Sequence, residues 1–379
     1  MKKISINLEK KLEFLIFRTI EICKAKNYDY SFTNQVRRKF FISLLLSIIL
    51  TRSVVFSEIA TELNDEVEFA SNIRRIQRFM KDYQLSYEQI ALMIAFFLPK
   101  GKWEVSIDRT NWQLGKKDFN ILSVTVYVKG IGVPVWFEML DNSGGNSNEG
   151  QRIDVFDKLK GLFGSGQISC VYGDREFIGQ RWVGYLVKQE IDFYIRVKCN
   201  TRVFLSSTQT RGCYAEKLMH KRTRYLENII VFGQRVNMVL KPLKTLKPNG
   251  KPDELLIITT LNAKSCLRAY KKRWSIEVFF QSIKKRGFNL EDTHLKEDQR
   301  LRKLLAAVCL AFVGCFAIGL FKHKKVKKIK TAKHGYKVKS FFRYGLDELR
   351  KALKRASRGK MDLLMDYFDK ILTGELMLT

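Results

Sequence analysis

The chain has 379 residues, 46% of them hydrophobic, which is enough material for one or two packed cores. Lys and Arg number 69 against 38 Asp and Glu, and the formal charge of +31 favours a polyanionic partner, either nucleic acid or an anionic membrane. Seven cysteines without a Cys-x-x-Cys pair, and only four histidines, argue against a disulfide framework and a zinc site and indicate a reducing cytoplasm.

Residues 1–100 are predicted to form a helical domain, because apolar residues recur at helical spacing and no proline precedes Pro99. Two short helices are expected within it, the first from about Ser57 to Asn64 and the second from about Ser71. The second exposes a set of basic residues: Arg74, Arg75, Arg78 and Lys81. The pair is typical of a helix-turn-helix that contacts DNA, and an ordinary helical bundle with a solvated basic face fits the spacing equally well.

After residue 101 the pattern changes to that of a mixed α/β domain, which we expect to extend to residue 320. Strands are expected at 103–108, 120–128 and 133–140, and the turn between the last two contains glycines that tolerate positive φ. A helix at 153–163 and further strands at 168–173 and 191–198 follow. Residues 199–253 are basic and rich in strands and turns, and we interpret them as an insertion before the strand at 255–261.

The segment Leu304–Phe321 carries no charge and is at the lower limit of length for a membrane span. We favour a buried core helix, because the segment stands alone in a chain of soluble patterns and its small residues suit tight packing. The region 321–379 is strongly basic with interleaved aromatic residues, which favours contact with a phosphate backbone over a solubilising surface.

One short helix, Tyr270 to Lys285, carries a single carboxylate among cations and bulky apolar residues. At about 100° per residue, one narrow stripe of this helix contains Tyr270, Arg273, Glu277 and Lys284. Three apolar residues fall on the opposite, core-facing side: Ile276, Phe279 and Ile283. On this evidence alone we favour an ordinary ion pair between Arg273 and Glu277 over a functional site, because such i,i+4 pairs are common on solvated helices.

Two more acids favour a site. Asp108 and Asp174 each follow an apolar strand, in a sheet whose order of elements is similar to the ribonuclease-H type. Three carboxylates that converge from two strand ends and a helix can hold the Mg²⁺ ions of two-metal phosphoryl transfer. Glu176 would point to the same face as Asp174 in an extended chain, and we prefer Asp174 because it is nearer the strand end.

The spacing Y-x2-R-x3-E-x6-K is met from Tyr270 to Lys284 without a gap, and Asp108 in IDRTNW and Asp174 in GDREF precede it in order. In these motifs, the chain resembles the bacterial insertion-sequence DDE transposases of the cut-and-paste class. The resemblance covers about 103–315 and implies a ribonuclease-H-like fold with a β-rich insertion, preceded by a helical DNA-binding domain.

The resemblance also implies roles for individual residues. Asp108 would bind both of two Mg²⁺ ions, for which Mn²⁺ is a substitute, Asp174 would hold one and Glu277 the other. The remaining motif residues would contact phosphates at the cleaved end: Tyr270, Arg273 and Lys284.

The implied partners are double-stranded DNA, as transposon ends and as target, and a second copy of the chain in a dimer on DNA. The expected location is the bacterial cytoplasm at the nucleoid, without a membrane. Three alternatives stay open: an inactive or repurposed end-binding protein, a nuclease that cleaves without joining strands, and a membrane-attached basic protein.

Overall fold

The computed structural model describes residues 2–64, 66–141, 145–246, 250, 252–333, 335–354 and 370. Its packing divides the chain into two compact units. Unit 1 comprises residues 1–100, 112–119 and 279–379, and unit 2 comprises residues 101–111 and 120–278. The domain boundaries expected at residues 100 and 320 stay predictions, and residues 334, 355–369 and 371–379 of the basic C-terminal region lie outside the described residues.

The main sheet confirms the prediction of a mixed α/β fold. In the described part of the chain it has eight strands in the order β3-β2-β1-β4-β5-β10-β9-β8. The strands are β1 (Trp103–Leu114), β2 (Lys117–Val128), β3 (Ile131–Met139), β4 (Ile168–Gly173), β5 (Asp192–Arg196), β8 (Arg224–Val231), β9 (Gln234–Leu246) and β10 (Pro252–Thr259). β1, β4 and β5 are parallel, whereas β10, β9 and β8 continue the sheet antiparallel, so the two long strands of the predicted insertion extend the same sheet.

Two tight hairpins fix the register of the antiparallel strands. Lys129 and Gly130, between β2 and β3, have φ of 49° and 87°, and Phe232 and Gly233, between β8 and β9, have φ of 52° and 73°. Two-residue loops with positive φ at both positions match the twist of the strands that they join. The first hairpin confirms the turn that the glycines at 130 and 132 predicted.

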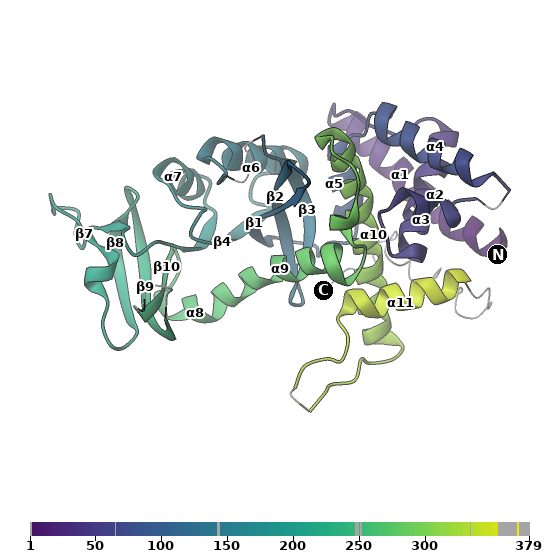
Figure 1. The fold of residues 1–379 in the computed structure, drawn as a ribbon. Coiled ribbons are helices and arrows are strands. Elements are labelled where there is room, and N and C mark those ends of the chain that lie inside the picture. The colour runs from purple at the N-terminus through teal and green to yellow at the C-terminus, as the bar shows by residue number, and fades with distance from the viewer. Residues whose placement is uncertain are drawn as a thin grey trace. The chain divides into compact units, whose positions relative to one another are not determined.

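Helices cover both faces of the sheet in unit 2 (Figure 1). α6 (Glu149–Phe163) and α7 (Gln180–Lys188) lie on one face, and α6 begins with a capping box in which Asn148 and Gln151 exchange hydrogen bonds. On the other face, a buried cluster that includes Tyr172 and Tyr194 packs against α8 (Cys266–Ala269) and Tyr270. This second layer brings the Tyr270–Glu277 segment to the sheet.

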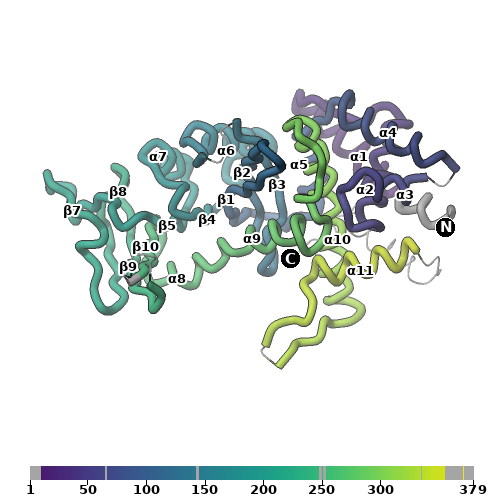
Figure 2. The backbone as a smooth tube through the Cα atoms, in the orientation of Figure 1, coloured from purple at the N-terminus to yellow at the C-terminus, as the bar shows by residue number. Residues whose placement is uncertain are grey.

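Unit 1 is helical and is organised around α10 (Asp298–Lys325). Its other helices are α1 (Lys2–Ala25), α2 (Gln35–Thr51), α3 (Phe56–Thr61), α4 (Phe69–Asp82), α5 (Tyr87–Ala95) and α11 (Phe341–Lys354). α10 packs against α2, α4, α5 and α11, so segments from opposite ends of the sequence share one core (Figure 2). Gly319 and Gly345 allow the backbones of α10 and α11 to touch, because a Cβ at either glycine would collide with a carbonyl oxygen of the other helix.

α10 is the one helix in the described residues that is long and apolar enough to cross a membrane by length and composition. Within the structure, however, 94% of its most apolar 18-residue window is buried. Burial on this scale favours the core role that we expected for Leu304–Phe321, because a helix that is apolar on all sides is compatible with a protein interior.

Candidate active site

Asp108 lies on β1, and Asp174 directly follows β4, the neighbouring parallel strand. In the ladder between β1 and β4, Ile107 is paired with Gly173, so the two aspartates are the next residues after the same rung. Parallel strands are about 4.8 Å apart, and paired positions present their side chains to the same face. The expectation that β1 ends at Asp108 is wrong, because the strand continues to Leu114 after its pairing with β4 has ended.

Glu277 is presented to the same part of unit 2 by a helix that is not regular. The segment expected to be one α-helix consists of a 3₁₀ turn η3 (Tyr270–Trp274), α9 (Ser275–Gln281) and a π turn η4 (Ser282–Arg286). The predicted core-facing side is confirmed, since all three of its residues are at most 2% exposed: Ile276, Phe279 and Ile283. These buried side chains anchor the segment, while the Glu277 side chain keeps 32% of its surface exposed.

Arg273 joins two of the three acids. Its Nη1 atom lies 3.0 Å from Oδ2 of Asp108 and 3.6 Å from Oε1 of Glu277. Burial lowers the pKa of the guanidinium, but Tyr270, Asp174, Asp108 and Glu277 together outweigh that effect and raise it. A simple ion pair between Arg273 and Glu277 on a solvated helix does not describe this arrangement. The Arg273 side chain is only 11% exposed, and its shorter contact is to Asp108.

Burial is the largest influence on the pKa of Asp108. It raises the pKa of the carboxyl from 3.8 to about 7, with Glu277 and Glu176 acting in the same direction, while Arg273 and the backbone N–H of Arg109 oppose it. The negative charge of Glu277 is therefore close enough to disfavour ionisation of Asp108.

Tyr270 is also held at this position. Its hydroxyl donates to the carbonyl oxygen of Gly173 at 3.3 Å, one residue before Asp174. Burial raises the pKa of the phenol, and the nearby Asp174 adds to the effect, so the side chain stays protonated and remains a donor.

The sequence did not reveal the role of Arg109. Its guanidinium makes a two-point contact with Glu176, with nitrogen–oxygen distances of 2.6 and 2.8 Å, and it donates to Oδ1 of Asn120 at 2.8 Å. Glu176 is thus engaged by a partner of opposite charge. The signal was present in the motif IDRTNW, where Arg109 follows Asp108, but only the fold brings residue 176 to it.

The other predicted site residues lie in unit 1. Lys284 is 2.8 Å from Glu291 and sits over the Trp112 ring, with its Nζ atom 5.1 Å from the ring centroid. Three predicted DNA contacts lie on α4, which begins at Phe69 instead of near Ser71: Arg74, Arg75 and Arg78. Arg74 and Arg78 are exposed, whereas the half-buried Arg75 lies over the Phe40 ring, 5.4 Å from its centroid.

Across the described residues, no group of three or more His, Cys, Asp or Glu side chains is arranged to hold a metal ion. The donor set nevertheless fits Mg²⁺ and Mn²⁺ chemically, because carboxylate oxygens are the ligands that hard cations prefer. The contacts of Arg273 with Asp108 and Glu277 mark where a cation is attracted.

The comparison with protein families agrees with the motifs. The family model of the transposase DDE domain matches residues 99–313, more than half of the chain. No curated protein matches the chain. A cryo-EM structure of the piggyBac transposase synaptic complex with hairpin DNA is similar to it with a TM-score of 0.48 and 13% sequence identity, over 90% of this chain and 77% of that chain.

Proposed function

The chain belongs to the family of transposases with a DDE domain, and from this premise we propose that it excises an insertion sequence at its ends and joins it to target DNA. Both steps are in-line displacements at phosphorus, so one set of catalytic groups can serve cleavage and strand transfer in turn. The observation that carries the proposal is the pairing of Ile107 with Gly173, the two residues that immediately precede Asp108 and Asp174.

In this proposal, Asp108, Asp174 and Glu277 hold two Mg²⁺ ions, or Mn²⁺ in their place. When bound, the two ions activate the attacking oxygen and stabilise the leaving oxygen. The parallel pairing of β1 with β4 supports the roles of the two aspartates, which follow the same rung. The contact between Glu176 and Arg109 supports Asp174 over Glu176, since a carboxylate that is paired at two points is less available to a metal.

The cationic and phenolic groups of the site are proposed to bind the DNA backbone. Arg273 is held between Asp108 and Glu277, so its guanidinium is fixed beside the position of the scissile phosphate before DNA arrives. Tyr270 keeps its proton and can donate a hydrogen bond to a phosphate oxygen by exchanging its present acceptor, the carbonyl oxygen of Gly173. Lys284 completes the motif in sequence and is proposed as a third phosphate contact.

We further propose a ribonuclease-H-like architecture for the catalytic region, preceded by a helical DNA-binding domain. The strand order β3-β2-β1-β4-β5 and the acids on β1 and after β4 support the first part. The exposed Arg74 and Arg78 on α4 support the second.

The proposed partners are double-stranded transposon ends and target DNA, with the protein acting as a homodimer at the nucleoid in the cytoplasm. The formal charge of +31 supports a polyanionic partner. A dimer is proposed because two transposon ends have to be brought together. The burial of α10 supports a protein that acts without a membrane.

The test uses full-length protein, Mg²⁺ and a labelled duplex that carries the DNA flanking the coding sequence. We expect nicking at the element's end in the wild type and its loss in Glu277→Ala, while Glu227→Ala, an exposed acid on β8, serves as the matched control. Retained nicking in Glu277→Ala would contradict the site. Tight binding without nicking by any protein would favour an inactive end-binding relative, and nicking without joined products would favour a nuclease.

A further inference from the structure

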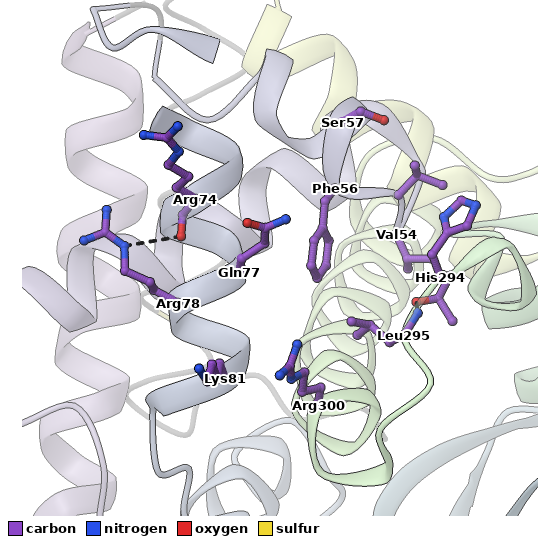
Figure 3. Close-up of a pocket in the computed structure, with 12 residues that line it drawn as sticks. Val54, Phe56, Ser57, Arg74, Gln77, Arg78, Lys81, His294, Leu295 and Arg300 are labelled. Atoms are coloured by element: carbon purple, nitrogen blue, oxygen red, sulfur yellow. Dashed lines mark hydrogen bonds between the residues drawn. The ribbon is translucent and has the colours of Figure 1, made fainter. Parts of the chain in front are cut away.

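A cavity of about 900 Å³ lies within unit 1, between α4 and the segment that leads into α10 (Figure 3). None of the twelve described residues that line it is acidic. Its cations come from both walls: Arg74, Arg78 and Lys81 from α4, and Arg300 from α10. Arg300 is partly balanced by Glu297, 2.8 Å from its Nε atom, which leaves the cavity with a clear positive excess. We call this cavity the α4 cleft.

The α4 side of the cleft is a single polar stripe. At about 100° per residue, its members fall within an arc of about 100° and all are exposed: Arg74, Gln77, Arg78 and Lys81. The buried residues Ile76 and Phe79 lie on the opposite side of the helix. The stripe thus has the dimensions of a helix face that can enter the major groove of DNA.

The helix that carries the stripe is firmly held. Buried Asn72 donates to the carbonyl oxygen of Asn64 at 2.9 Å and to that of Ala60 at 3.4 Å, which ties α4 to the turn after α3. Arg75 does not belong to the stripe. Its guanidinium lies over Phe40 and contacts Oδ1 of Asn72 at 3.5 Å, so it supports the helix from behind. A recognition surface needs this kind of fixed backbone, because base contacts depend on position.

Gln77 differs from its neighbours on the stripe. It is the only uncharged side chain among the four, and in Figure 3 its amide points toward the middle of the cleft, near Phe56. An amide offers a donor and an acceptor together, which is the pattern that adenine presents in the major groove. The charged members can attract any phosphate backbone, whereas Gln77 can distinguish one base pair from another.

We propose that the α4 cleft is where the protein reads the sequence of double-stranded DNA, with Gln77 on an A·T base pair and Arg300 gripping a phosphate from the opposite wall. This assignment rests on the proposed function. It adds Gln77 as the residue that determines sequence specificity and Arg300 as a phosphate contact from the wall opposite α4. The volume of the cleft, about 900 Å³, is that of a pocket for a small ligand, so it is too small for a duplex. We propose that α4 enters the major groove and that the cleft holds a short stretch of the backbone of one DNA strand.

The test selects preferred duplexes for full-length protein from a random library and then measures binding by fluorescence anisotropy over a salt series. Gln77→Ala should lose about 5- to 100-fold of the discrimination at one base pair, with an unchanged salt slope. Gln77→Glu should move the preference at that position from A to C, because a carboxylate accepts from the cytosine amino group. A new preference cannot result from misfolding.

Arg300→Gln should lower the slope of log affinity against log salt by about 1 and leave the selected sequence unchanged. Gln84→Ala and Arg18→Gln are the matched controls, since both residues are exposed in unit 1 and neither lines the cleft. An unchanged selected sequence in both Gln77 variants, or an unchanged salt slope in Arg300→Gln, would overturn the cleft assignment alone. A wild type that binds no duplex would overturn the proposed function as well.

Discussion

The substitution Asp108→Asn should make the metal-free protein less sensitive to pH. The carboxyl pKa of Asp108 is about 7 in the folded protein against an ordinary value of 3.8, chiefly because the side chain is buried. Between these values the folded state holds a proton that the unfolded state has released, so stability falls as pH rises and the loss is complete above about pH 7. From pH 5 to pH 8 this amounts to about 3 kcal/mol, at 1.36 kcal/mol for each pH unit up to the folded pKa. The amide of Asn at position 108 does not titrate, so this pH-dependent loss of stability is absent from the variant.

The assay is denaturant unfolding of both proteins in EDTA at pH 5, 6, 7 and 8. The free energy of unfolding of the variant relative to the wild type should rise by about 3 kcal/mol over this range. Parallel pH profiles would refute the reasoning, because they would mean that Asp108 is ionised throughout. Repeating the series with Mg²⁺ adds a second check: the ion should stabilise the wild type most above pH 7, where the carboxylate exists, and the variant less.

Two further predictions concern packing and support. Gly345→Ala should lower the free energy of unfolding by about 2–3 kcal/mol or more, because its Cβ would collide with the carbonyl of Cys315. Gly314→Ala is the control and should be neutral or mildly stabilising, because its Cβ meets no atom within 4 Å. Equal effects would contradict the close approach of α10 and α11. Arg109→Gln should cost about 2 kcal/mol, less than the full penalty for breaking a buried ion pair, because Glu176 is 20% exposed. A double-mutant cycle with Glu176→Gln measures the coupling free energy between Arg109 and Glu176. A coupling near zero would mean that their contact does not stabilise the fold.

The sequence predicted the parts of the fold and site that depend on local pattern. Alternation of apolar residues located the central strands, because burial on a pleated sheet repeats every two residues. The position of Asp174 after an apolar run followed from the same rule. The apolar spacing around Glu277 predicted the buried side of its helix, since only that side can pack against the core.

Local sequence patterns could not predict features that depend on residues elsewhere in the chain. β1 continues past Asp108 because Asn120 and its neighbours on β2 lie alongside, and nothing near residue 108 signals that partner. The segment from Tyr270 to Lys285 contains no proline or glycine, so its composition does not signal the break into 3₁₀ and π turns. The contact between Arg109 and Glu176 spans 67 positions in the chain, and only the register of β1 with β4 creates it.

The charges of the site explain why Arg273 belongs to it even before DNA is considered. Two carboxylates that lie near one half-buried guanidinium, those of Asp108 and Glu277, repel each other, and a proton, a metal ion or a neighbouring cation can offset that repulsion. In the described structure, Arg273 contacts Asp108 and Glu277, and the raised pKa of Asp108 allows a proton to supply part of the balance. In the proposed function, Asp108 and Glu277 would hold a divalent cation that supplies this positive charge, and Arg273 would then be available to a phosphate. Under that proposal, binding of the ions and contact of Arg273 with the DNA backbone would favour each other, because both depend on the same release of Arg273 from the two carboxylates.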